Sequence, residues 1–108
     1  MNDVPDRPQP RFDLAAPEVD EAVIMAAALA DPLRAGILWL LADGPHCVCE
    51  MAAALGAREN NISNHLARLR AVGLVRAVRH HGNGRFLYYQ RDEPMIARAR
   101  AAIDEVLR

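Results

Sequence analysis

Two cysteines separated by a single residue, Cys47 and Cys49, are the side chains of this 108-residue chain best suited to chemistry. A thiolate is a soft ligand, and two thiols at this spacing can close a small chelate ring around one soft metal ion. The same pair could form a thiol redox switch, or fill a core as small apolar side chains. A thiol enzyme is disfavoured, because oxidoreductases place two residues between their cysteines in a strand-helix context that this chain lacks. Ion binding and redox sensing both remain open.

A second group of polar side chains lies on a helix predicted over Asn60–Val72. At about 100° per residue, Ile62, Leu66 and Leu69 point in similar directions and form its core face. The opposite face offers amides, a hydroxyl and a guanidinium, which can donate to and accept from base edges in the major groove of DNA. His65 lies about 60° from the core direction, so it can contact either a phosphate or a neighbouring helix. The predicted base-contacting residues are Asn60, Asn61, Ser63, Asn64 and Arg68.

A β-hairpin is predicted directly after this helix, which ends at Gly73. Residues 74–80 form the first strand, the Gly-Asn-Gly sequence at 82–84 supplies a tight turn, and residues 85–90 form the returning strand. Basic side chains of the hairpin, together with Arg70 near the end of the helix, are expected to contact phosphates, which position a protein on DNA without specifying sequence. The two histidines are expected to contact DNA or solvent, although a borderline ion such as nickel would accept their imidazole nitrogens. These basic residues are Arg70, Arg76, Arg79, His80, His81 and Arg85.

The net charge of −1 conceals an uneven distribution along the chain. Residues 1–57 carry three Arg and nine Asp or Glu, which is −6, whereas residues 58–91 carry seven Arg and one Glu, which is +6. Residues 92–108 carry three Arg and four acids, which is −1. A charge run alone can be a solvated face, but this one coincides with the polar helix and the basic hairpin. The combination favours one surface that meets nucleic acid.

The remaining elements must position these groups, and the composition favours helices because 52% of the residues are hydrophobic but only 5% are aromatic. Asp31 followed by Pro32 is typical of a helix N-cap and first turn. The apolar face of that helix is predicted to contain Leu33, Ile37, Leu40 and Leu41. That helix is predicted over Pro32–Ala42, and further helices are predicted over Val19–Leu29, Val48–Leu55 and from Asp92 to the C-terminus. The order α-α-α-α-β-β-α predicts a mainly α, winged helix-turn-helix fold with a two-stranded β-hairpin.

The two ends of the chain differ in character. Residues 1–17 are rich in proline and charge, which predicts a flexible arm ahead of one domain over residues 18–108. The longest apolar run, Val23–Ala30, is far shorter than the roughly 20 residues that span a bilayer, and no signal peptide is apparent. We therefore expect a cytoplasmic protein without a membrane segment.

The predicted last helix carries an apolar stripe that a domain of this size cannot fully cover. Such a stripe indicates a homodimer, formed through the first and last helices. The residues of the stripe are Ile96, Ala99, Ile103, Val106 and Leu107.

Four stretches of the chain form a specific combination, although none is specific alone. They are ADPLRAGIL at 30–38, HCVCEM at 46–51, ISNHLARLRAVGLV at 62–75 and GRFLYYQ at 84–90. Together they resemble the ArsR/SmtB family of metal-responsive winged helix-turn-helix repressors, over about residues 19 to 107. The resemblance implies a homodimer that binds a palindromic DNA operator without inducer. It also implies that a metal or metalloid ion lowers DNA affinity and so releases genes for efflux, detoxification or metal handling.

The resemblance also places Cys47 and Cys49 in the helix before the recognition helix, where relatives bind arsenite, cadmium, lead or similar ions. His46, an acid, water or a small thiol is expected to complete the ligand set, and the candidate effectors are As(III), Cd(II), Ni(II), Zn(II) and Cu(I). Side chains at i and i+2 of a regular helix point about 200° apart, so both thiols reach one ion only if the first turn is distorted. We expect such a distortion to displace the recognition helix.

Overall fold

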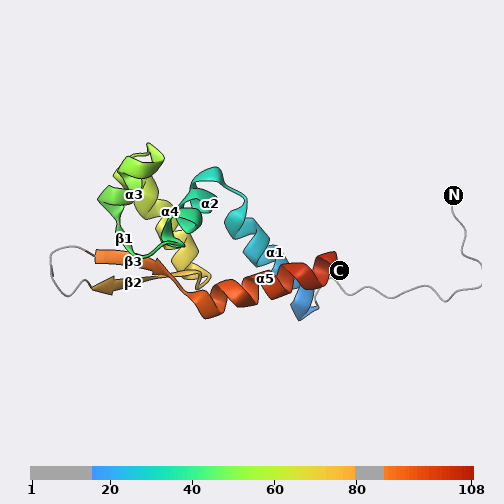
Figure 1. Cartoon of the computed structure of the whole chain (residues 1–108). Coiled ribbons are helices and arrows are strands. Elements are labelled where there is room, and N and C mark those ends of the chain that lie inside the picture. The colour runs from blue at the N-terminus through green and yellow to red at the C-terminus, as the bar shows by residue number, and fades with distance from the viewer. Residues whose placement is uncertain (1–15, 80–86) are drawn as a thin grey trace, which may run out of the picture.

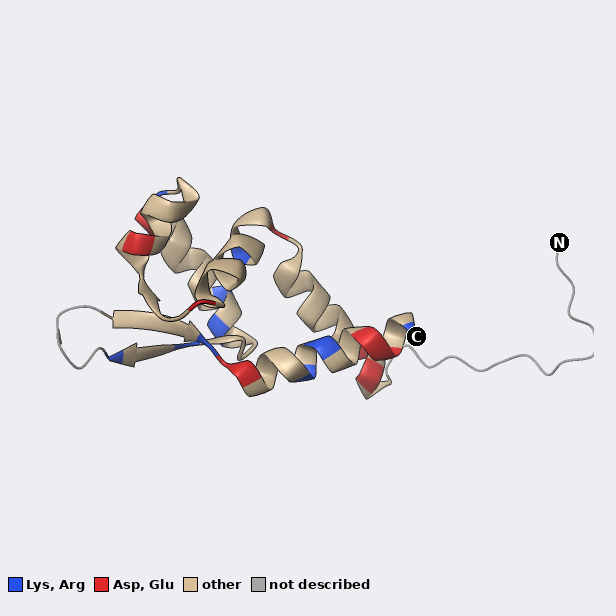
Figure 2. Ribbon diagram, viewed as in Figure 1, with Lys and Arg blue, Asp and Glu red and all other residues tan. Residues whose placement is uncertain are grey.

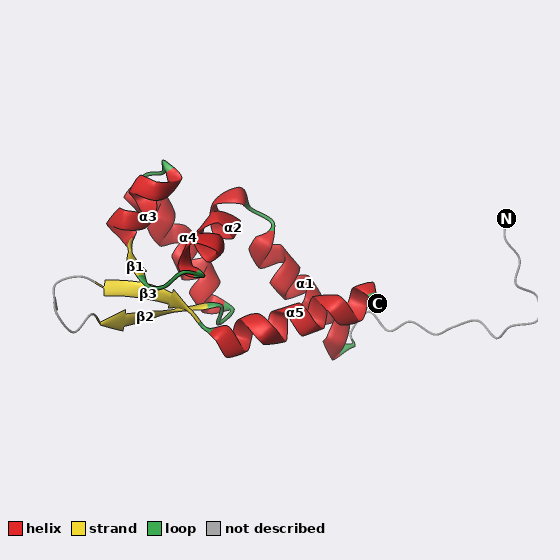
Figure 3. Ribbon diagram, viewed as in Figure 1, coloured by secondary structure: helices red, strands yellow, loops and turns green. Residues whose placement is uncertain are grey.

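The computed structural model describes residues 16–79 and 87–108, which form five helices and three short strands (Figures 1 and 3). The elements are α1 (Pro17–Leu29), α2 (Pro32–Leu41), β1 (His46–Cys47), α3 (Val48–Leu55), α4 (Glu59–Ala71), β2 (Val75–Arg79), β3 (Leu87–Arg91) and α5 (Glu93–Leu107). Helices α2, α3 and α4 gather beside the sheet at one end of the molecule, while α1 and α5 lie together at the other (Figure 1). This confirms the predicted winged helix-turn-helix, in which α3 and α4 are the helix pair and β2 with β3 is the wing.

The sheet contains one strand more than the sequence predicted. Its order is β1-β3-β2 and all its pairs are antiparallel, so that Cys47 lies opposite Tyr88 and Tyr88 lies opposite Val78. β1 has two residues, which is too short to show an alternating pattern in the sequence. It leads into α3 without a loop. The predicted wing turn at 82–84 lies outside the described residues.

The buried face of α2 differs from the predicted one, whereas that of α4 is confirmed. On α4 the buried residues are Ile62, Leu66 and Leu69. On α2 they are Arg34, Ile37, Leu38 and Leu41. The predicted core residues Leu33 and Leu40 are half-buried. The helix is turned so that Arg34 enters the interior, which is possible because its polar groups find partners there.

α1 begins two residues earlier than predicted. Pro17 is its first residue, because proline lacks the N–H that a first-turn residue cannot use within the helix. Most of the predicted arm, residues 1–15, lies outside the described residues. Within the described residues, 16–79 and 87–108, no single helix is long and apolar enough to cross a membrane. Helices α1 and α2 together reach that length and composition, but across a 92° bend.

α1 and α5 pack along each other at the end of the molecule away from the sheet (Figure 1). An ion pair between Arg98 of α5 and Glu21 of α1 joins them. An apolar hollow of about 270 Å³ lies between the helices. Several large apolar side chains beside this hollow are exposed, including Val23, Val106 and Leu107. The stripe of α5 is thus only partly covered by its own chain, as predicted.

Candidate nucleic-acid interface and thiol pair

The outward face of α4 carries the predicted base-contacting side chains. All five are exposed, and they are Asn60, Asn61, Ser63, Asn64 and Arg68. Since the apolar residues of the helix lie on its other side, α4 presents a continuous polar surface of a width that fits the major groove. Asparagine can bond adenine and arginine can bond guanine in that groove, each through two hydrogen bonds. The geometry is that of a recognition helix, and the individual base contacts stay a prediction.

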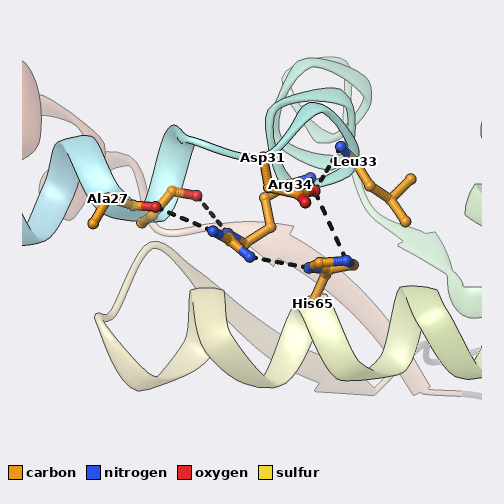
Figure 4. Close-up of polar contacts among 6 residues, drawn as sticks. Ala27, Asp31, Leu33, Arg34 and His65 are labelled. Atoms are coloured by element: carbon orange, nitrogen blue, oxygen red, sulfur yellow. Dashed lines mark hydrogen bonds and ion pairs between the residues drawn. The ribbon is translucent and has the colours of Figure 1, made fainter.

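His65 faces the protein rather than the polar surface of α4. Its Nδ1 lies 3.1 Å from a terminal nitrogen of Arg34, and its Nε2 lies 3.8 Å from a carboxylate oxygen of Asp31 (Figure 4). Since the guanidinium can only donate, Nδ1 accepts, and a neutral ring then carries its proton on Nε2, toward Asp31. In the structure His65 therefore contacts α2. A phosphate contact stays a prediction.

Arg34 is a buried cation that connects three helices. Its Nε donates to the carbonyl of Ala28 at 2.7 Å, and a terminal nitrogen donates to the carbonyl of Ala27 at 3.1 Å (Figure 4). Both carbonyls belong to the last turn of α1, where negative partial charge accumulates, and that of Ala27 also accepts from the backbone N–H of Ala30 at 3.2 Å. With His65 as its third partner, Arg34 holds α1, α2 and α4 together. Sequence reasoning missed this role, although Arg34 lies three residues before Ile37 on the apolar stripe of α2.

Basic side chains continue from α4 onto the wing. Arg76 and Arg79 of β2 are exposed, and the guanidinium of Arg70 lies 6.0 Å from the centre of the Tyr89 ring, which connects the end of α4 to β3. Figure 2 shows basic segments on α4, on the strands and in the middle of α5, and acidic segments on α1, on α3 and at both ends of α5. The basic residues of the sequence segment 58–91 thus lie on α4 and the wing, although α5 carries arginines as well. The predicted contacts His80, His81 and Arg85 lie outside the described residues.

The two thiols meet where β1 joins α3. Cys47 is the last residue of β1 and the N-cap of α3, with an extended backbone (φ −85°, ψ 167°), and Cys49 lies in the first turn. Their Sγ atoms are 2.6 Å apart, and both cysteines are free. The reason for expecting a distorted first turn does not hold, since Cys47 lies outside α3. Because Cys47 precedes the helix, the angular separation of i and i+2 side chains within a helix does not apply, and the thiols meet without disturbing α3.

The surroundings of Cys47 keep its thiol protonated at neutral pH. Burial of the side chain, and next its hydrogen bond with Cys49, raise the pKa of Cys47 to about 11. The backbone N–H of Cys47 donates to Glu50 at 2.9 Å, which closes a capping box and is the main reason that the pKa of Glu50 is lowered. A negative charge therefore already stands beside the thiols. Ionising Cys47 requires a partner that supplies positive charge.

His46 does not join the cysteines in a preformed metal site. Its Nδ1 lies 3.6 Å from the carboxylate of Glu50. Within residues 16–79 and 87–108, no group of three or more His, Cys, Asp or Glu side chains is placed to hold a metal ion. The structure thus brings together two of the three predicted ligands, and the third is held elsewhere.

Comparison with known proteins identifies the family. Residues 31–77 match the arsR family of bacterial regulatory proteins. The HTH-type transcriptional regulator CmtR of Mycobacterium bovis is 40% identical over 83 residues, which are 77% of this chain and 68% of that protein. This chain belongs to the ArsR family. It is therefore a DNA-binding transcriptional regulator and not an enzyme.

This ArsR-family chain is also similar to an arsenical resistance repressor and to a homodimeric DNA-binding domain. The arsenical resistance operon repressor of Escherichia coli is 38% identical over 81 residues, which are 74% of this chain and 67% of that protein. The solution structure of a homodimeric winged helix-turn-helix DNA-binding domain from Mycobacterium bovis is similar with a TM-score of 0.67 and 33% identity. That similarity covers 90% of this chain and 87% of the other.

Proposed function

We propose that this ArsR-family protein is a cytoplasmic, homodimeric repressor whose affinity for a palindromic operator changes when a soft metal or metalloid ion binds Cys47 and Cys49. One observation carries the proposal. The two Sγ atoms are 2.6 Å apart at the junction that leads into the helix-turn-helix. A ligand that binds both sulfurs therefore acts directly on the unit that meets DNA.

The donor set suits a soft ion. Thiolates prefer such ions, and a cation would stabilise the ionised form of Cys47, which its surroundings disfavour. His46 is the proposed third protein ligand, and it would have to leave Glu50 to bind. Water or a small thiol is the competing third ligand. As(III) is the first candidate because one relative is an arsenical resistance repressor, and Cd(II), Ni(II), Zn(II) and Cu(I) are the others.

The DNA-contacting surface is proposed to consist of α4 and the wing. In a two-fold dimer, two copies of α4 would enter successive major grooves, which explains a palindromic operator. The dimer is proposed to form through α1 and α5, because their exposed apolar side chains border a hollow that a second copy can cover. On this proposal the exposed face of α4 contacts bases, while Arg70 and Arg79, with His80, His81 and Arg85 outside the described residues, contact phosphates.

The test measures operator affinity with and without each ion. A DNA site is first selected from a random library by the purified protein, and binding is followed by fluorescence anisotropy of the labelled site. We expect one soft ion to change the affinity, accompanied by ultraviolet absorption from thiolate-to-ion charge transfer. The double variant Cys47→Ser/Cys49→Ser should keep operator binding and lose the response. If no ion changes the affinity of the wild-type protein, the ion-sensing function is excluded.

The short sulfur separation also favours a second candidate function, a thiol redox switch. Hydrogen peroxide would take two electrons and two protons from the thiols, so that two S–H bonds break, one S–S bond forms and two waters are released. The discriminating treatment is peroxide in metal-free buffer. A two-dalton loss of mass with altered operator affinity, reversed by a dithiol reductant, supports this candidate. Unaltered affinity after complete oxidation excludes it.

A further inference from the structure

The thiol pair lies at a joint between the two elements that meet DNA. Cys47 is at once a member of β1, which pairs with β3 of the wing, and the N-cap of α3. Cys49 belongs to α3, and residues 56–58 alone separate α3 from α4. One sulfur is therefore attached to the wing sheet and the other to the helix-turn-helix. A ligand that holds both sulfurs sets the position of one element relative to the other.

A row of side chains continues from the thiols across the sheet. Cys47 lies opposite Tyr88, and Tyr88 lies opposite Val78, so these three side chains share one face. At a strand spacing of about 4.8 Å, the row crosses the wing within roughly 10 Å. The register places Tyr88 directly opposite Cys47, and burial, followed by the negative charge of Glu50, raises the pKa of Tyr88. The row ends one residue before the exposed Arg79.

The wing is also easier to move than α4. Helix α4 is anchored by three buried leucine and isoleucine side chains and by the contact between His65 and Arg34. On the wing, Val75 at the start of β2 is buried, but Val78 and Tyr88 are half-buried and Leu87 is exposed. Elements with few buried contacts rearrange at lower free-energy cost than core helices. A change at the thiols therefore meets less resistance in the direction of β3 than in the direction of α4.

We propose that occupation of Cys47 and Cys49 changes operator affinity through the wing, with Tyr88 as the positioning residue that connects the thiols to β2 and β3. This inference rests on the proposed function, since it describes how the same site is regulated. It differs from transmission through α3 and α4 alone in one measurable respect. The contribution of a wing arginine to operator affinity must depend on whether the thiols are occupied.

The test is a thermodynamic cycle on Arg79. Operator affinity is measured for the wild type and for Arg79→Ala, each with and without arsenite as the probe. Without arsenite we expect Arg79→Ala to weaken binding by about five- to tenfold, as for a lost phosphate contact. With arsenite bound, the same substitution should change affinity by less than about twofold, because the contact is already lost. Arg108→Ala, an exposed arginine at the C-cap of α5, is the matched control and should have no effect in either state.

Tyr88 is tested by two further variants. Tyr88→Leu should still bind arsenite, as measured by thiolate absorption, but Arg79→Ala should then cost the same factor in both states. Tyr88→Phe keeps the ring and should restore the wild-type difference. As an independent readout, arsenite should shift the backbone amide resonance of Val78 in the wild type but not in Cys47→Ser/Cys49→Ser.

The outcomes separate the two proposals. If arsenite changes operator affinity but Arg79→Ala costs the same factor with and without it, the inference about the wing is overturned and the proposed function stands. If Arg79→Ala has no effect without arsenite, the wing inference is likewise overturned. If arsenite binds the thiols but leaves wild-type affinity unchanged, the wing inference is overturned, whereas the proposed function fails only if none of the candidate ions changes the affinity.

Discussion

Replacing Arg34 by alanine should destabilise the whole domain, because its guanidinium is buried and satisfies groups on two other helices. The side chain is 9% exposed and has partners at 2.7 Å (Ala28), 3.1 Å (Ala27) and 3.1 Å (His65). Hydrogen bonds to a charged group contribute about 1.5–3 kcal/mol each, and water recovers part of this for carbonyls at a helix end. We expect a loss of about 3–5 kcal/mol in total. That is a large share of the roughly 5–15 kcal/mol that stabilises a typical domain.

The assay is urea unfolding followed by the circular dichroism of the helices. Protein concentration is held constant, because the stability of a dimer depends on it. Arg34→Lys keeps the charge but not the planar fork that serves two carbonyls and a ring, so its loss should be intermediate. Arg100→Ala removes an exposed arginine and should change stability by less than about 0.5 kcal/mol. A loss below about 1 kcal/mol for Arg34→Ala would refute the claim that this cluster joins the helices.

Four further predictions concern the thiols, the folded scaffold and the recognition helix. Near pH 8, Cys49 should react with iodoacetamide while Cys47 stays largely unmodified because its pKa is about 11, and equal rates by tandem mass spectrometry would contradict this. Hydrogen bonds from α2, first among them that from the Arg34 backbone, lower the pKa of Asp31 from its ordinary value of 3.8. The Asp31 carboxylate therefore stabilises the fold above pH 3.8, and this contribution is lost as the pH falls through the lowered pKa. The melting temperature of Asp31→Asn should therefore fall less steeply with acidification than that of the wild type, and equal slopes would exclude this contribution. Gly73 has a φ of 82°, so Gly73→Ala should cost about 1–2 kcal/mol in urea unfolding, and an unchanged midpoint would show that no strain results. Asn64→Ala should weaken specific operator binding by about 1–3 kcal/mol without affecting random DNA, and an unchanged preference would remove α4 from its assigned role.

The recognition helix could be predicted because its information is local. Ile62, Leu66 and Leu69 repeat at helical spacing, and the residues between them are polar, so one periodic pattern defines both faces. The structure confirms that division, and the five residues predicted to contact bases are exposed, whereas His65 turns toward α2. The charge division could also be read directly from the order of residues. Its interpretation as one surface required only that the helix and the hairpin, which are adjacent in the sequence, also lie next to each other in the fold.

The environments of Arg34 and Cys47 could not be predicted in the same way. An arginine on an apolar stripe is normally assigned to the surface, and its burial depends on carbonyls of α1 and on His65, which lie elsewhere in the chain. The family resemblance places Cys47 in the helix, whereas in the structure it belongs to β1, a strand too short to have a pattern of its own. Its extended conformation depends on pairing with Tyr88, across forty residues of intervening chain. Both cases are decided by contacts between distant segments, which periodicity does not report.

These two environments together suggest why a sensor would be placed at Cys47. On the side of α1 and α2, the helix-turn-helix is held by a buried cation with three hydrogen-bonding partners. On the side of the wing, α3 is joined through β1, a strand of two residues whose last member is also its cap, and α4 meets the wing through Arg70 and Tyr89. A ligand has to bias an arrangement that can change, and the short strand is the weaker of these two connections. A thiol pair placed across that connection acts on the wing and on the helix-turn-helix at once, whereas a site on the opposite side would have to displace Arg34 from its partners.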